Sequence, residues 1–115
     1  MMRSGVLPEI ELNLTREPKP KPSGTGLKFG RIFTDHMFIM EYYEGRGWHS
    51  PRIVPYQPVT LEPSAMVFHY AQTAFEGLKA FRSADGRVRL FRPEMNIRRL
   101  NRSCGRLSIP PVDEK

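Results

Sequence analysis

An Asp-Gly dipeptide at residues 85–86 stands between two runs in which apolar and polar side chains alternate. Asp-Gly is among the strongest local signals of a β-hairpin, because a type I′ turn requires positive φ at both central residues. A two-residue loop here pairs Phe81 with Leu90 and Ser83 with Val88, so that these four side chains share one face. The opposite face then carries Arg82, Ala84, Arg87 and Arg89. The sequence therefore predicts a hairpin in which one face is mainly apolar and the other face is mainly polar.

A helix is predicted directly after this hairpin. Pro93 fits the first turn of a helix, where its missing N–H removes no hydrogen bond. Four apolar residues then recur at helical spacing, and these are Ile97, Leu100, Cys104 and Leu107. Pro110 and Pro111 end the pattern. The other faces carry Arg98, Arg99, Arg102 and Arg106. Like charges at this spacing repel, which leaves two interpretations: a solvated basic face, or a site for an anion.

The region before the hairpin reads as short strands. Residues 35–44 are rich in Met, Ile, Phe and Tyr and predict a strand, which a turn over residues 44–47 ends. Residues 52–56 form a second short run between Pro51 and Pro55, so we expect an edge or irregular strand there. Residues 59–61 and 66–70 predict further extended pieces. Strands followed by a helix, mostly in hairpin order, indicate an α+β domain with an antiparallel sheet.

The first 26 residues predict a flexible arm rich in Pro and Lys. Residues 16–26 read REPKPKPSGTG, in which Lys-Pro repeats favour an extended conformation and the Gly, Ser and Thr residues favour flexibility. Residues 27–115 are then the folding part, and a chain of 115 residues has room for one small domain at most. No apolar stretch has the length of a signal peptide core or a membrane span, so we expect a cytoplasmic protein without membrane contact.

Charge and residue counts exclude several kinds of site. The net charge of +6 raises nucleic acid as a partner, but no nucleic-acid-binding motif is present, so we expect none. A single cysteine, Cys104, excludes an internal disulfide and a cysteine metal cluster. His36, His49 and His69 lack the spacing of metal ligands, so we expect no metal. A non-catalytic basic binding module remains an alternative, which a salt-sensitive shift of nucleic acid would indicate.

Four strings carry a resemblance that extends from about Leu27 to the end of the chain. They are FTDHMFIMEY from residue 33, GWHSPRIVPYQPVTLEPSA from residue 47, HYAQTAFEGLKAFR from residue 69 and RLFRPEMNIRRLNRS from residue 89. In order and spacing they resemble the N-terminal region of branched-chain amino acid aminotransferases, which are fold-type-IV pyridoxal-phosphate enzymes. The resemblance implies an incomplete small N-terminal domain of such an enzyme, homodimeric when complete. The implied reaction transfers the amino group of leucine, isoleucine or valine to 2-oxoglutarate.

The resemblance also implies roles for individual residues. Arg99 occupies the place of the arginine that binds the phosphate of pyridoxal 5'-phosphate, and a guanidinium suits that task because it offers a rigid, permanently charged fork. Arg98 falls where relatives vary and is expected on the surface. No catalytic residue is implied in this chain, because none of its lysines matches the Schiff-base lysine. Glu76 is implied to support the geometry of its motif, and is not the proton shuttle.

Three aromatic residues match those that line the substrate pocket of the family, and they are Phe29, Tyr70 and Phe75. Rigid aromatic walls suit an aliphatic substrate side chain. From residue type alone, aromatic residues are more typical of a core. Other fold-type-IV enzymes, such as D-amino acid aminotransferase or aminodeoxychorismate lyase, are a further alternative. The FTDHMF and GWHSPRI strings argue against them, because these strings resemble the N-terminal extension of the branched-chain group.

Overall fold

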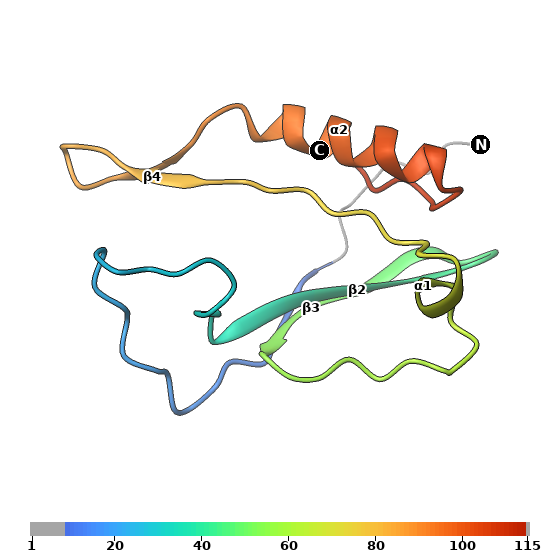
Figure 1. Ribbon diagram of the computed structural model, residues 1–115, viewed down its shortest axis with the longest axis horizontal. Coiled ribbons are helices and arrows are strands. Elements are labelled where there is room, and N and C mark those ends of the chain that lie inside the picture. The colour runs from blue at the N-terminus through green and yellow to red at the C-terminus, as the bar shows by residue number, and fades with distance from the viewer. Residues whose placement is uncertain (1–8, 115) are drawn as a thin grey trace. The chain divides into compact units, whose positions relative to one another are not determined.

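The computed structural model describes residues 9–114, which fall into two compact units. The first unit ends at Thr60 and the second begins at Leu61. The first contains a small sheet, and the second contains a hairpin and a longer helix, so the chain has the predicted α+β composition (Figure 1). The boundary predicted between residues 26 and 27 is a different division, and it stays a prediction.

The sheet of the first unit has the strand order β1-β3-β2. Strand β2 (His36–Tyr43) pairs antiparallel with β3 (Gly47–Pro55), which confirms the predicted strand over residues 35–44 and the turn after it. Strand β1 (Glu11–Leu12) pairs parallel with β3, and the N–H of Asn13 continues the pairing to the carbonyl of Ile53 at 2.9 Å. The sheet is therefore mixed, whereas the sequence predicted antiparallel pairing. The predicted arm contains a strand that its composition did not reveal.

The sequence predicted an edge or irregular strand over residues 52–56, and the edge position is wrong whereas an irregularity in the pairing is present next to Pro51. Strand β3 lies in the centre of the sheet and is longer than predicted. The pairing register shifts between Ile39 and Glu41, so that Ser50 and Pro51 lie opposite the single residue Met40. Such a bulge leaves one residue without a ladder partner, which is a place where a strand tolerates proline. The two-residue strand β1 covers only Arg52 and Ile53 on the other side, so it avoids both prolines.

The second unit begins with a single helical turn, α1 (Met66–His69), and not with the extended run predicted for residues 66–70. The N–H of Tyr70 donates to the carbonyl of Met66 at 2.9 Å, and the His69 imidazole hydrogen-bonds the Pro63 carbonyl at 2.7 Å. A short apolar run has too few residues for its period to separate a strand from a helix turn. No strand forms over residues 59–61 either.

The predicted hairpin forms, but its register is one residue away from the predicted register. Strand β4 (Ala80–Arg82) pairs with β5 (Val88–Leu90) so that Phe81 lies opposite Arg89. The N–H of Gly86 donates to the carbonyl of Ser83 at 2.9 Å, and of these loop residues only Gly86 has positive φ, at 78°. A tight turn followed by one left-handed glycine is a three-residue loop and not a type I′ turn.

The shifted register redistributes the hairpin side chains. Phe81 now shares a face with Arg89, while Val88 shares the other face with Arg82. The predicted separation into apolar and polar faces is therefore wrong, and all six strand residues are exposed. The Asp85 carboxylate stabilises the loop instead. It accepts a hydrogen bond from the backbone N–H of Arg87 at 3.1 Å, and one from each terminal nitrogen of the Arg89 guanidinium, at 3.1 and 2.7 Å.

We expect Gly86→Ala to destabilise the chain by about 1–2 kcal/mol, because only the left-handed backbone is strained and no atom lies within 4 Å of the added Cβ. Gly105→Ala is the matched control, since Gly105 lies in a helix with equally open surroundings. That change should stabilise by up to about 1 kcal/mol through helix propensity. Free energies of unfolding from urea titration measure both. Equal effects of the same sign would contradict the assigned turn.

The helix α2 (Pro93–Arg106) confirms the prediction made from the apolar stripe. Pro93 takes its first position, and Cys104 is its buried residue, at 6% exposure. The helix ends before Pro110, because Ser108 adopts φ of 55° and the Ile109 N–H donates to the Cys104 carbonyl at 3.0 Å. This pattern is a Schellman motif with serine in the left-handed position.

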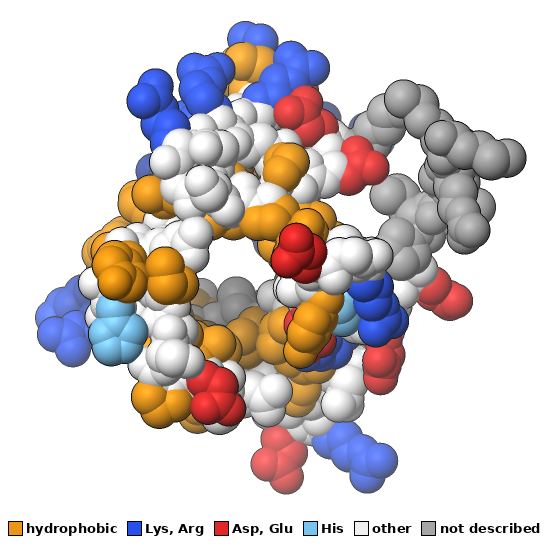
Figure 2. All heavy atoms as spheres, turned by 90° about the vertical axis from the view of Figure 1, so that its right-hand side faces the viewer, with side chains coloured by type: hydrophobic (Ala, Val, Ile, Leu, Met, Phe, Trp, Pro, Cys, Tyr) orange, Lys and Arg blue, Asp and Glu red, His pale blue; other side chains and the backbone are white. Residues whose placement is uncertain are grey.

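Two extended segments of the second unit are tied to α2. The Gln72 side chain donates to the Leu107 carbonyl at 2.8 Å, and the Asn101 side chain makes two 2.9 Å hydrogen bonds with the backbone of Val112. Residues 70–79 consequently run along the helix (Figure 1). The described residues include few buried apolar side chains, which are Pro51 and Val54 in the first unit and Cys104 in the second. Many large apolar side chains lie at the surface, as the orange side chains in Figure 2 show.

Candidate functional site

The four predicted site residues are distributed over both units. Phe29 belongs to the first unit and is fully exposed. Tyr70, Phe75 and Arg99 belong to the second unit, with Tyr70 74% and Phe75 92% exposed. The aromatic side chains of Phe29, Tyr70 and Phe75 are all exposed, so among the described residues they do not form the core that their residue type favours.

Arg99 belongs to a cluster of four hydrogen-bonded residues, which we call the Glu76 cluster: Glu76, Gly77, Asn96 and Arg99. The Arg99 guanidinium donates from Nε to Oε2 of Glu76 at 2.6 Å, and from Nη2 to Oε1. The Gly77 N–H donates to Oε1 at 3.0 Å. The Asn96 amide donates to Oε1 at 3.1 Å and to the Gly77 carbonyl at 2.8 Å. Glu76 thus accepts hydrogen bonds from three residues.

The local sequence explains how these groups meet. Asn96 and Arg99 are three residues apart in α2 and so lie on the same side of the helix. The hydrogen bond of Gln72 to Leu107 fixes the preceding segment near the other end of the helix. Glu76 is therefore placed against the first half of α2, with Phe75 beside it in sequence.

The two partners of the ion pair differ in exposure. The Glu76 side chain is only 10% exposed, whereas that of Arg99 is 65% exposed. A guanidinium carries five N–H donors, and Glu76 takes two of them. The Nη1 side of Arg99 accordingly has donors left for an anion, such as a phosphate ester. The donor chemistry of Arg99 therefore fits one contact to a phosphate group.

Arg99 keeps the pKa of the Glu76 carboxyl far below its usual value of 4.5, at about 2. Desolvation acts in the opposite direction, and the hydrogen bonds from Asn96 and Gly77 add to the lowering. The same pair raises the pKa of Arg99. Both groups are therefore charged at neutral pH, and the pair persists over the physiological range.

We expect the Glu76 carboxyl to titrate with a midpoint near pH 2. A carboxyl whose pKa is lowered by folding stabilises the folded chain above its unfolded value, and the stabilisation disappears as pH falls from about 4.5 to about 2. Carbon-13 NMR of the Glu76 side chain measures this midpoint. Arg99→Ala should raise it toward 4.5, and Arg98→Ala should leave it unchanged. A midpoint near 4.5 in the unmodified chain would show that the pair is absent in solution.

Arg98 has different surroundings from those of Arg99. Its Nε donates to Oε2 of Glu114 at 3.3 Å, and its Nη1 lies 3.9 Å from the sulfur of Met95. It makes no contact with Glu76 in the described part of the chain. The two neighbouring arginines are thus paired with different carboxylates, one near the tail and one in the Glu76 cluster.

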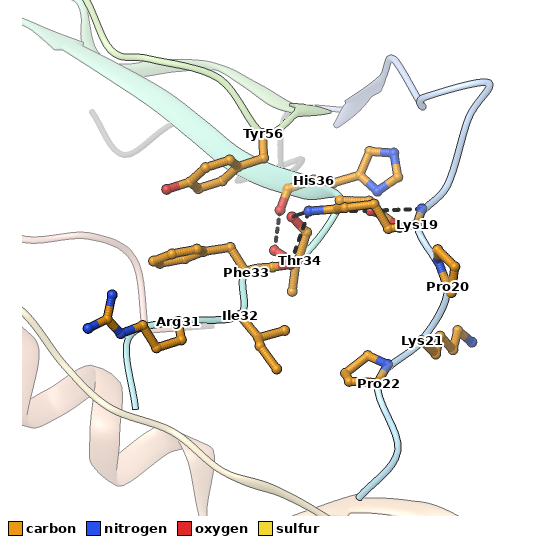
Figure 3. A pocket seen from close by; sticks show the side chains of 11 residues that line it. Lys19, Pro20, Lys21, Pro22, Arg31, Ile32, Phe33, Thr34, His36 and Tyr56 are labelled. Carbon is orange, nitrogen blue, oxygen red and sulfur yellow. Dashed lines mark hydrogen bonds and ion pairs between the residues drawn. The ribbon is translucent and has the colours of Figure 1, made fainter. Parts of the chain in front are cut away.

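The first unit contains a separate groove, drawn in Figure 3. Its walls are formed by the Lys-Pro segment and by residues 31–36, and the rings of Phe33 and Tyr56 stack within it at 5.3 Å. Lys19 closes one side through its ammonium group, which contacts the carbonyls of Phe33 and Thr34 at 3.3 and 3.5 Å. None of the four predicted site residues lines this groove.

Other classes of site find no support within residues 9–114. No group of three metal-ligating side chains is present there. No helix in that range is long and apolar enough to cross a membrane.

The sequence prediction did not include Asn96. Its spacing of three residues from Arg99 was a usable signal, whereas the contact between Glu76 and Arg99 spans 23 residues and has no periodic signature.

Comparison with known proteins gives the family. No protein-family profile matches the chain. The chain is 61% identical over 106 residues, or 92% of its length, to branched-chain-amino-acid transaminase 1 of Bacillus subtilis. It is 50% identical over 83% of its length to the cytosolic branched-chain-amino-acid aminotransferase of Saccharomyces cerevisiae. It is 46% identical over 92% of its length to the mitochondrial one of Bos taurus.

These similarities define the class first: the chain is related to aminotransferases. Within that class the relatives compared all carry the name branched-chain-amino-acid transaminase or aminotransferase, which confirms the resemblance seen in the four strings. The chain spans 30%, 25% and 27% of the lengths of these three relatives.

Proposed function

We propose that the chain supplies part of a branched-chain amino acid transaminase. The reaction is the reversible transfer of the amino group of leucine, isoleucine or valine to 2-oxoglutarate, giving the branched 2-oxo acid and glutamate. The observation that carries the proposal is the 61% identity to a named transaminase over 92% of the chain. The exposed guanidinium of Arg99, fixed by Glu76, supports it with a donor suited to an anionic cofactor.

The cofactor of the proposed enzyme is pyridoxal 5'-phosphate, which supplies the electron-accepting ring that amino-group transfer requires. Arg99 would hold its phosphate group. No described residue is assigned a proton-transfer role, because by the resemblance none of the lysines of this chain matches the Schiff-base lysine of the family.

Phe29, Tyr70 and Phe75 are proposed as walls of the pocket for the aliphatic substrate side chain. Their exposure supports this role, because an exposed aromatic ring can contact a ligand whereas a core ring cannot. Aromatic walls discriminate between aliphatic side chains by only about 1–3 kcal/mol per methylene. Such walls set the preference among leucine, isoleucine and valine, and the chemistry itself depends on other groups.

The remaining features of the proposal follow from the family. The chain would form an incomplete small domain of the fold-type-IV architecture, preceded by an arm over residues 1–26. The complete enzyme would be a cytoplasmic homodimer that acts on small molecules, with no nucleic acid or membrane as partner. All the relatives compared carry the branched-chain name, which disfavours a D-amino acid aminotransferase or an aminodeoxychorismate lyase.

A hybrid enzyme tests the proposed function. In it, this chain replaces the matching 106-residue segment of the Bacillus subtilis relative, which supplies the rest of the protein. We expect the purified hybrid to convert leucine and 2-oxoglutarate to products at a rate within about tenfold of the relative, because more than half of the replaced positions are unchanged. A hybrid that folds and holds cofactor but transfers no amino group would contradict the proposal.

In the hybrid, Phe75→Ala and Tyr70→Phe should change the ratio of activities on leucine and valine without abolishing transfer. Pocket walls affect differential binding of the two substrates, and the expected change in ratio is about threefold to tenfold for Phe75→Ala. Tyr42→Phe is a matched control for the tyrosine change, since Tyr42 packs against Trp48 in the sheet. Unchanged ratios and rates in both site variants would remove these residues from the pocket.

A further inference from the structure

The orientation of the Arg99 guanidinium is fixed by contacts at one edge only. Its Nε and Nη2 atoms face the two carboxylate oxygens of Glu76. The end of the guanidinium formed by Nη1 and the second Nη2 hydrogen makes no hydrogen bond with the described residues, and the side chain is 65% exposed. The fork therefore has one occupied edge and one edge that faces solvent.

Glu76 is itself held rigidly enough to act as a reference point. It is 10% exposed and accepts hydrogen bonds from the Gly77 N–H at 3.0 Å and from the Asn96 amide at 3.1 Å. The Asn96 amide also binds the Gly77 carbonyl at 2.8 Å, so the backbone next to Glu76 is tied to the same helix as Arg99. A long arginine side chain loses much rotamer freedom when it is paired in this way.

We propose that Glu76 is the positioning residue for anion binding at Arg99: it occupies the Nε–Nη2 edge and directs the Nη1–Nη2 edge toward the phosphate group of a ligand. This inference rests on the proposed function and deepens it. It assigns Glu76 no contact with the ligand. The ligand class is a phosphate monoester dianion, whose oxygens accept paired N–H donors from one guanidinium edge.

Charge and orientation predict opposite effects of removing the Glu76 carboxylate. A carboxylate near an anion site repels the anion, so its removal by charge alone strengthens phosphate binding. If Glu76 orients Arg99, its removal weakens phosphate binding, because the guanidinium must then be ordered by the ligand itself. The sign of the change in affinity therefore separates the two roles.

The experiment titrates the purified hybrid enzyme, freed of its cofactor, with inorganic phosphate at constant ionic strength, because salt screens exposed charges. Nitrogen-15 NMR follows the arginine side-chain resonances. We expect phosphate to shift the Nη resonances of Arg99 while its Nε–H stays protected from exchange by Glu76. Glu76→Gln should weaken phosphate binding by about threefold to tenfold. Loss of Nε–H protection on adding phosphate would overturn the proposal, since Glu76 would then be a competitor of the anion.

Two further variants keep the test decisive. Glu76→Asp retains the charge and shortens the reach, so it should also weaken binding, and it replaces Glu76→Gln if that variant unfolds. Glu114→Gln is the matched control, because it likewise removes one carboxylate charge, here the one paired with Arg98 on the same helix. It should leave the phosphate affinity at Arg99 unchanged or slightly stronger. Equal or stronger phosphate binding by both Glu76 variants would overturn the proposal.

Arg99→Ala distinguishes failure of this inference from failure of the proposed function. If Arg99→Ala leaves phosphate affinity unchanged, the phosphate role of Arg99 fails and the inference fails with it. If Arg99→Ala weakens binding while both Glu76 variants bind as the unmodified hybrid does, Arg99 keeps its role and only the positioning by Glu76 is wrong.

Discussion

Arg99→Ala in the hybrid enzyme is expected to release pyridoxal 5'-phosphate at least about tenfold more readily than Arg98→Ala, because a charge-assisted hydrogen bond to phosphate is among the stronger single contacts. The two residues are adjacent and carry the same charge. They differ in their partners, since Arg99 lies in the Glu76 cluster and Arg98 pairs with Glu114. Dialysis against cofactor-free buffer, followed by absorbance of the retained cofactor, measures the difference.

The arginine pair controls for net charge as well as for position. Each variant removes one positive charge from α2, so a general electrostatic effect of the helix on the cofactor would lower retention equally in both. Equal cofactor loss from Arg99→Ala and Arg98→Ala would therefore withdraw the phosphate role from Arg99. A return of retention in Arg99→Lys to the unmodified level would show that charge suffices and the fork is not required.

The elements with many periodic residues could be predicted from the sequence. Helix α2 has an apolar stripe of four residues and a proline at its first position, and the structure has the helix where the stripe predicts it. Strand β2 likewise has the predicted place. In both, the local pattern is long enough to specify one period.

The wrong predictions all depended on short segments or distant partners. The hairpin register depended on the turn type, and the same Asp85-Gly86 dipeptide serves a three-residue loop when only Gly86 is left-handed. Pro51 argued for an edge strand, but a bulge opposite Met40 lets β3 continue in the sheet centre. Strand β1 pairs with residues about forty positions later, and no local pattern in two residues reveals such a partner.

The candidate site shows the same division. The place of Arg99 in a helix followed from its neighbours in sequence, while its assigned ligand came from the resemblance alone. Its carboxylate partner is 23 residues away, so spacing could not identify the pair. The exposure of Tyr70 and Phe75 is a property of packing, and residue type had favoured a core for both.

The 115-residue chain by itself is expected to be inactive in amino-group transfer. Its lysines are Lys19, Lys21, Lys28, Lys79 and Lys115. By the resemblance, none of them matches the cofactor-binding lysine of the family. Arg99 would have to hold the cofactor without that covalent bond, and one contact does not offset the roughly 4 kcal/mol or more that association costs in lost freedom of motion. The hybrid enzyme, which regains that lysine from the relative, is the positive control.

Borohydride reduction in the presence of pyridoxal 5'-phosphate tests the central claim most directly, because it fixes the cofactor to the lysine that holds it. The claim is that this chain provides the phosphate contact and pocket walls of a transaminase without the lysine. Mass spectrometry of the hybrid should find one stoichiometric adduct in the part supplied by the relative, and sparse labelling scattered over exposed lysines in the chain alone. A single stoichiometric adduct on the chain alone, at Lys79 for example, together with measurable amino-group transfer, would contradict it.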